Sequence, residues 1–219
     1  MRFLLAFLVG CNALAAPSDL ADKVRDARER MHRRFEASQR MQYAIAVGQL
    51  DRARSEAESV NALEEPDALP QWRDHIDRIR AAAREVVATK DLVAASKASA
   101  RLGQQCANCH VAGKSRIVFA KPTPPPASSQ MASHAWAAAR MWEGLIGPDD
   151  ERWLLGARRL SEAKVTLTAE DGSLGIADDV SRMKLLARRA LDPKTQPDRA
   201  GLYGDLLATC AHCHFAIRD

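Results

Sequence analysis

The chain has 219 residues, of which 47% are hydrophobic and 5% aromatic, and its formal net charge at pH 7 is +4. Once an N-terminal export segment is removed, this length suits one large domain or two domains of about 100 residues each. Mixed arginine and glutamate runs such as residues 25–34 are typical of a solvated helix face, so the basic balance gives no reason to expect nucleic-acid binding. No strand-like alternation of any length occurs, which favours an all-α protein.

Residues 1–15 are predicted to be a signal segment for export. The apolar run at 3–9 is far shorter than the roughly 20 residues that a membrane-spanning helix needs. Residues 8–11, Leu-Val-Gly-Cys, are similar to a bacterial lipoprotein box, and cleavage there would leave Cys11 as a lipid-carrying N-terminus. The alternative is ordinary cleavage after the Ala-Leu-Ala at 13–15, which would discard Cys11. The pattern favours lipidation and predicts a periplasmic protein anchored to the membrane.

The first domain is expected at residues 18–120, and the 3.6-residue hydrophobic period predicts four helices in it. In chain order these helices span about residues 24–45, 51–61, 72–86 and 91–110. Gly48 is expected to end the first helix, and the fourth begins near Asp91. Four helices with short connections predict an antiparallel up-down bundle.

Residues 121–130, which include Pro122 and the run Pro124 to Pro126, cannot continue a helix and are predicted to form a stiff domain linker. The second domain, residues 131–219, repeats the helical plan. Met31 and Met41 recur 100 residues later as Met131 and Met141, and Cys106 recurs 104 residues later as Cys210. These offsets indicate a duplicated unit of about 100 residues.

Each copy ends in Cys-x-x-Cys-His, the signature of covalent haem c attachment. Two thiols on one helical turn can each bond to a haem vinyl group, and the next imidazole can reach the iron. We therefore expect two haem c groups, with attachment through Cys106, Cys109, Cys210 and Cys213 and proximal iron ligation by His110 and His214.

A Cys-x-x-Cys pair has three other uses in proteins: a zinc site, a thiol–disulfide pair and an iron–sulfur ligand set. A zinc ribbon would place its two pairs about 15–20 residues apart, and a thioredoxin-like pair would need a βαβ context. Neither condition is met. The two haems would use four of the five cysteines and Cys11 lies in the signal segment, so no cysteine is left for a disulfide.

This pattern resembles the class II cytochromes c, four-helix bundles with Cys-x-x-Cys-His near the C-terminus. The resemblance covers nearly all of the mature chain, twice over, and extends to a basic residue four positions after each histidine, Lys114 and Arg218. It implies two tandem up-down bundles, each with a haem site at the end of its fourth helix. Members of this class often form homodimers.

The resemblance also implies that the distal side of each haem is covered by the first helix of its bundle. The candidates by position are Met31 and Met131, near the expected start of each first helix. A methionine on an apolar stripe is otherwise core filling, which is the interpretation favoured for Met41 and Met141. His32 and His134 are the rival distal ligands.

We expect a non-enzymatic electron carrier that exchanges single electrons with redox partner proteins. The alternative is a cytochrome c′-like protein that binds or senses NO or CO at an open distal site. A dihaem peroxidase is less favoured, because such enzymes are generally larger. Both haem ends are expected to face the linker, which predicts that the two haems are neighbours.

Overall fold

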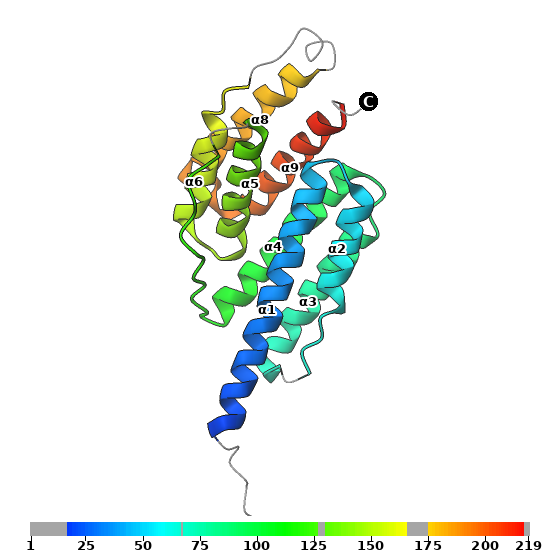
Figure 1. Cartoon of the computed structure of the whole chain (residues 1–219), viewed down its shortest axis with the longest axis vertical. Helices are drawn as coiled ribbons and strands as arrows, with labels where there is room; N and C mark the ends of the chain where they lie inside the picture. The colour runs from blue at the N-terminus through cyan, green and yellow to red at the C-terminus, as the bar shows by residue number, and fades with distance from the viewer. Residues whose placement is uncertain (1–16, 67, 127–129, 166–174, 217–219) are drawn as a thin grey trace, which may run out of the picture.

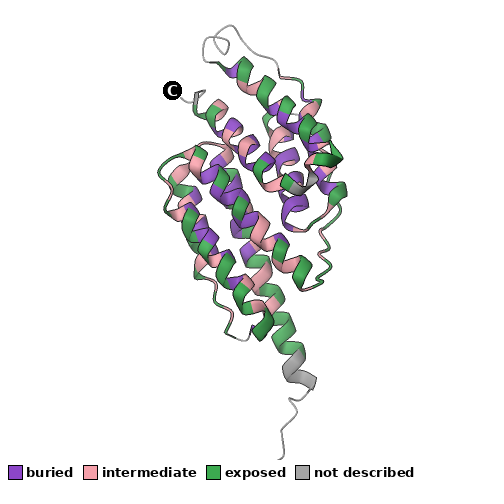
Figure 2. Ribbon diagram, turned by 180° about the vertical axis from the view of Figure 1, so that it is seen from behind, coloured by how far each residue is buried: buried purple, intermediate pink, exposed green. Residues whose placement is uncertain are grey.

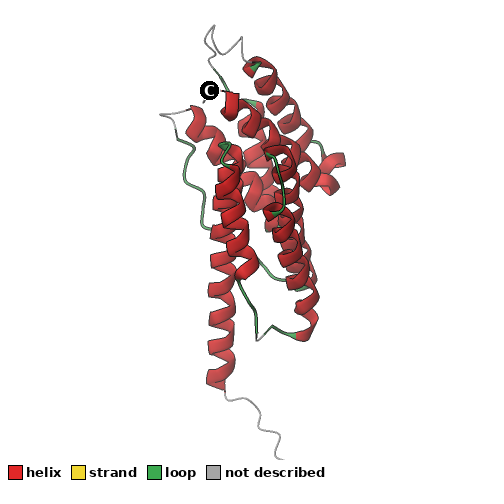
Figure 3. Ribbon diagram, turned by 90° about the vertical axis from the view of Figure 1, so that its right-hand side faces the viewer, coloured by secondary structure: helices red, strands yellow, loops and turns green. Residues whose placement is uncertain are grey.

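The computed structural model describes residues 17–66, 68–126, 130–165 and 175–216 (Figure 1). Within these residues it contains eight α-helices, a short 3₁₀ helix and no β-strand, which confirms the all-α prediction (Figure 3). No helix in the described ranges is both long and apolar enough to cross a membrane. The predicted signal segment 1–15 and the predicted lipidation site Cys11 lie outside the described residues.

The first half of the chain forms four helices: α1 (Pro17–Ala46), α2 (Leu50–Ala62), α3 (Pro70–Val87) and α4 (Leu92–Ala112). Each packs against the next helix in the chain, and α1 also contacts α4. Gly48 follows α1 with a φ of +75°, a left-handed conformation that glycine adopts readily, and it ends the helix as predicted. Asp91 caps α4 by accepting a hydrogen bond from the amide of Ala94 at 2.7 Å.

The second half contains α5 (Gln130–Ile146), α6 (Asp150–Ser161), α8 (Ile176–Ala190), a 3₁₀ helix (Pro193–Asp198) and α9 (Arg199–Ala216). These four α-helices contact one another in the same chain order as α1 to α4 do. Asp149 caps α6 by accepting a hydrogen bond from the amide of Arg152 at 3.0 Å. The two halves therefore share one packing order.

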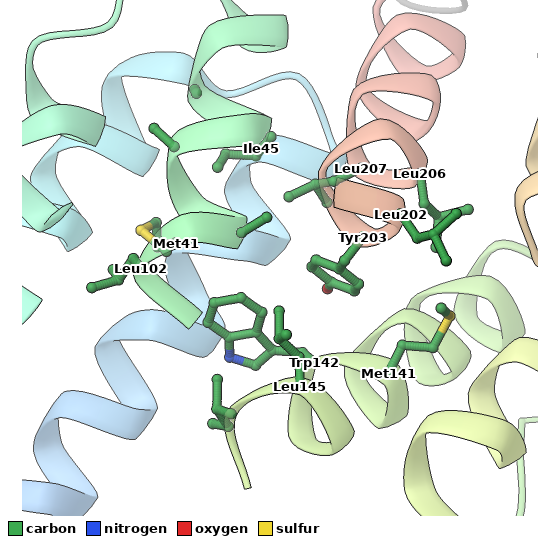
Figure 4. Close-up of a cluster of buried hydrophobic side chains, with 14 of the residues drawn as sticks. Met41, Ile45, Leu102, Met141, Trp142, Leu145, Leu202, Tyr203, Leu206 and Leu207 are labelled. Carbon is green, nitrogen blue, oxygen red and sulfur yellow. The ribbon is translucent and has the colours of Figure 1, made fainter. Parts of the chain in front are cut away.

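The two halves meet along α4 and α9, which pack against each other (Figure 1). Trp142 of α5 and Tyr203 of α9 are fully buried, with ring centroids 5.5 Å apart (Figure 4). Gly103 of α4 makes room for the indole, because a Cβ there would lie 2.8 Å from Cζ3 of Trp142. A single hydrophobic cluster runs through both halves, and buried residues line the inward faces of their helices (Figure 2).

The segment between α4 and α5 lies against the second half. The backbone carbonyl of Ala120 accepts a hydrogen bond from Nη2 of Arg152 at 2.6 Å, and that of Thr123 accepts one from Nε1 of Trp136 at 2.9 Å. The guanidinium of Arg152 also lies over the ring of Phe119, 4.8 Å from its centroid. The segment before the predicted linker is thus anchored to α6 through Phe119 and Ala120, and the linker itself is anchored to α5 through Thr123.

Candidate functional site

The second Cys-x-x-Cys-His motif lies near the C-terminal end of α9 and lines a pocket of about 190 Å³. Cys210 and Cys213 are half-buried, and neither forms a disulfide with another described residue. Most other lining side chains are apolar and come from three further helices, among them Tyr43 and Ala46 of α1, Met131 and Ala135 of α5, and Val180 and Met183 of α8. Because α1 belongs to the first half, the pocket is built by both halves of the chain.

His214 points at the methionine predicted to be its distal partner. Its Nε2 lies 3.4 Å from Sδ of Met131, which is in the first turn of α5. Its Nδ1 is buried and has no hydrogen-bond partner among the described residues. Nε2 of His214 and Sδ of Met131 are in direct contact, so a group bound between these two atoms would have to move them apart. The structure therefore brings together Cys210, Cys213, His214 and Met131, the four residues that the sequence assigned to the second haem.

The polar side chains that line this pocket include those of His134 in α5 and Asp179 in α8. Burial lowers the pKa of His134, and the positive charges of His214 and Arg159 lower it further, which favours the neutral imidazole. Oδ2 of Asp179 lies 2.7 Å from Nδ1 of the exposed His212. Burial raises the pKa of Cys210 to about 12, with smaller contributions from the negative charges of Cys213 and Asp179.

The first motif lies at the C-terminal end of α4, where its imidazole is oriented by the backbone of α5. Nδ1 of His110 is 2.7 Å from the carbonyl oxygen of Ile146, which can only accept a hydrogen bond. This contact puts the proton on Nδ1 and leaves Nε2 with a lone pair, the arrangement common among metal-binding histidines. Burial lowers the pKa of His110, which also favours the neutral ring.

A buried ion-pair network lies beside the thiols of the first motif. Arg34 of α1 donates from Nη1 to Glu65 and from Nη2 to the carbonyl of Leu63, and Nε of Arg30 donates to Glu65 at 2.6 Å. Burial raises the pKa of Cys106 to about 12, with a further increase from Cys109, and the charge of Arg34 opposes the shift. Burial likewise raises the pKa of Cys109, against the charges of Arg34 and Arg78.

The first motif has no methionine contact equivalent to that of the second among the described residues. Met31 is half-buried, and no hydrogen bond joins it to His110. The sequence placed Met31 near the start of the first helix, but α1 begins at Pro17, so Met31 lies in the middle of this 30-residue helix. His32, the rival ligand, is exposed.

The prediction that the two haem sites are neighbours is wrong, because the motifs lie at opposite ends of α5. His214 contacts Met131 in the first turn of this helix, and His110 contacts Ile146 at its last residue. Fifteen residues of helix separate these contacts by roughly 22 Å. The physical reason is the segment between α4 and α5, which in an extended form of about 3.1 Å per residue is long enough to pass along the whole of α5.

Comparison with known protein families, with curated proteins and with solved structures finds no match to this chain. The chain's own residues fit a covalently attached haem c at both motifs. In each, two thiols lie one helical turn apart next to an imidazole, and in the second an apolar pocket and a thioether face that imidazole.

The sequence patterns did not identify Arg34, Glu65 and Asp179 as neighbours of the cysteines. The repeat offset could have pointed to Arg34. The offset of 100 residues that pairs Met31 with Met131 also pairs Arg34 with His134, and His134 lines the pocket of the second motif.

Proposed function

We propose that this chain is a dihaem c-type cytochrome that carries single electrons. The observation that supports this most directly is the contact of 3.4 Å between Nε2 of His214 and Sδ of Met131, in an apolar pocket that Cys210 and Cys213 also line. Bound haem c would supply an iron that alternates between ferric and ferrous states. Cys210 and Cys213 would hold it covalently, and His214 and Met131 would be its iron ligands.

At the first motif Cys106 and Cys109 would hold the second haem. His110 would be its proximal ligand, in the orientation set by the carbonyl of Ile146. Met31 is the proposed distal ligand, because it stands 100 residues before Met131. Pockets lined by apolar side chains exclude water. The iron ligands and nearby charges therefore have a larger effect on the reduction potential of the haem.

We also propose the domain organisation, export and membrane attachment that the sequence predicts. Residues 18–120 and 131–219 would be two copies of one four-helix unit, exported by the signal segment and held at the membrane by a lipid on Cys11. The partners would be redox proteins that exchange electrons with the two haems. The protein would have no enzymatic activity of its own.

Haem attachment is tested by producing the chain in a host with haem c attachment machinery and measuring its intact mass. The expected mass is that of the mature chain, including the proposed lipid on Cys11, plus two haems. Replacing the first pair with Cys106→Ser and Cys109→Ser, or the second with Cys210→Ser and Cys213→Ser, should remove one haem each. Cys11→Ser is the matched control, because it removes a cysteine outside both motifs and should leave both haems. A chain that carries no haem under these conditions would overturn the proposal.

Absorption spectra with and without carbon monoxide separate an electron carrier from a gas-binding protein. Two six-coordinate irons should give low-spin spectra that do not change when the gas is added. High-spin spectra that shift with carbon monoxide would instead support an open distal site and a cytochrome c′-like function.

A further inference from the structure

The two motifs differ in the charge that lies beside their cysteines. At the first motif Arg34 lies one turn of α1 after Met31, the proposed distal ligand, and it is 5% exposed and held in place by Glu65 and by the carbonyl of Leu63. Its remaining donor, Nε, is buried and has no hydrogen-bond partner among the described residues. The positive charge of Arg34 lowers the pKa of both Cys106 and Cys109, which agrees with a position of Arg34 beside the attachment site.

The ion-pair network around Arg34 has a net positive charge. Among the described residues, the carboxylate that pairs with both Arg30 and Arg34 is Glu65, and the two arginine side chains are 14% and 6% exposed. Two cations against one anion leave a net charge of +1 in a site that water screens poorly. Arg78 adds a further positive charge that acts on Cys109.

The second motif has the opposite arrangement. Asp179 lines the same pocket as Cys210 and Cys213, and its side chain is only 13% exposed. Its ion-pair partner, His212, is 68% exposed, so water screens the imidazole far more than the carboxylate. The position that corresponds to Arg34 is occupied by His134, whose neutral form is favoured. The described residues that line the pocket therefore include the half-buried carboxylate of Asp179 and no arginine or lysine, and Arg159 and Lys184, whose positive charges also act on His134, lie outside the lining.

We propose that the haem at the first motif has a higher reduction potential than the haem at the second, because buried Arg34 favours the ferrous state at one site and Asp179 disfavours it at the other. This inference rests on the proposed function. An added electron lowers the charge of the iron by one, so a fixed nearby cation stabilises the reduced site and a fixed anion destabilises it.

The consequence is a direction for electron movement within the molecule. With both haems bound, one electron would pass from the haem held by Cys210 and Cys213 to the haem held by Cys106 and Cys109, which would oxidise the former by one electron and reduce the latter by one. No proton is transferred, and no covalent bond forms or breaks. The second site is thus the internal donor, and the first is the site from which an acceptor protein would draw electrons.

The first experiment compares the two single-haem forms of the full chain. Spectroscopic redox titration of the variant with Cys210→Ser and Cys213→Ser reports the first haem, and titration of the variant with Cys106→Ser and Cys109→Ser reports the second. The first haem should have the higher potential. Equal potentials, or the reverse order, would overturn the inference while leaving the dihaem proposal intact. Failure of both variants to bind haem would overturn both.

The second experiment removes each charge. Arg34→Gln should shift the potential of the first haem downward, and Asp179→Asn should shift that of the second upward, with absorption spectra unchanged because the axial ligands are untouched. The matched controls are the adjacent exposed residues, Arg33→Gln and Asp178→Asn, which change the net charge by the same amount and should leave the potentials unchanged.

Loss of Arg34 leaves buried Glu65 with one partner fewer, so Asp179→Asn provides a test that does not depend on that network. A potential of the second haem that stays constant in Asp179→Asn would contradict the assignment of its charge. Shifts of the control variants as large as those of the buried residues would contradict it as well, because net charge alone would then explain them.

Discussion

Met131 lies at the start of α5 with 39% of its surface exposed, yet its sulfur contacts the imidazole of His214. In the form that retains only the second haem, Met131→Leu keeps an apolar side chain of similar size and removes the sulfur. We expect a low-spin spectrum to become high-spin, carbon monoxide to bind the ferrous protein, and the reduction potential to fall, because methionine ligation favours the ferrous state. Absorption spectra with and without the gas measure the change.

Met183 supplies the control for this variant, because it lines the same pocket from α8 and no hydrogen bond joins it to His214 among the described residues. Met183→Leu should leave the spectrum and its indifference to carbon monoxide unchanged. Equal responses of the two variants would mean that pocket shape, rather than the sulfur of Met131, determines coordination.

The buried thiols should also react slowly in protein made without haem attachment machinery. Burial raises the pKa of Cys106 and of Cys210 to about 12, so at a pH of about 8 both are thiols rather than the reactive thiolates. Compared with a thiol of ordinary pKa 9.0, the thiolate fraction is lower by about a thousandfold. Alkylation by iodoacetamide should therefore be slow in the folded chain and rise about tenfold per pH unit below pH 12, as peptide mass spectrometry would measure. Unfolding in urea should remove the difference, and equal rates before and after unfolding would contradict it.

At the scale of the helix, the N-cap of α4 supports the position of the first motif. Asp91 accepts a hydrogen bond from the amide of Ala94, which would otherwise lack a partner at the helix start. Asp91→Ala should lower the free energy of unfolding by about 1 kcal/mol in urea titrations of the holoprotein. Lys90→Ala, a change at the exposed preceding residue, should have an effect within about 0.5 kcal/mol. An equal loss in both variants would show that the cap does not contribute.

Helix ends with local signals were predictable from the sequence, and one helix start without such a signal was not. Gly48 and Asp91 mark the end of α1 and the start of α4 in the sequence as in the structure. The apolar stripe of the first helix begins at Val24, whereas α1 begins at Pro17 and is exposed at residues 21–26, so no apolar periodicity marks its first turns. This is why Met31 was placed too close to the start of its helix.

The features of the candidate site also fall into those that the sequence could predict and those that it could not. The contact between Met131 and His214 follows from an up-down arrangement of consecutive helices, which a sequence pattern can indicate. The separation of the two motifs, and the charges of Arg34 and Asp179 beside them, depend on how α4 packs against α9 and how side chains from distant helices meet. No local period or motif encodes those contacts.

At the scale of the whole molecule, the two halves share one core although each carries its own motif. Trp142 of α5 packs on Tyr203 of α9 and donates a hydrogen bond from Nε1 to Oγ of Ser38 in α1, at 3.4 Å. The hydroxyl of Tyr203 donates to Oε1 of Gln42, also in α1, at 2.8 Å. Unfolding of either half would expose these groups, so the two halves should unfold together.

Gly103→Ala tests this coupling at the contact between the halves. The new Cβ would lie 2.8 Å from Cζ3 of Trp142 and 2.9 Å from Cδ2 of Leu145, and overpacking of this kind costs about 1–3 kcal/mol. Thermal unfolding of the holoprotein, followed by circular dichroism and by tryptophan fluorescence, should show one coincident transition that moves to lower temperature in the variant. Asn108→Ala, at an exposed position of the same helix, should leave the midpoint nearly unchanged. Two separate transitions, with only one of them shifted by Gly103→Ala, would mean that the halves are independent domains and that the shared core does not couple them.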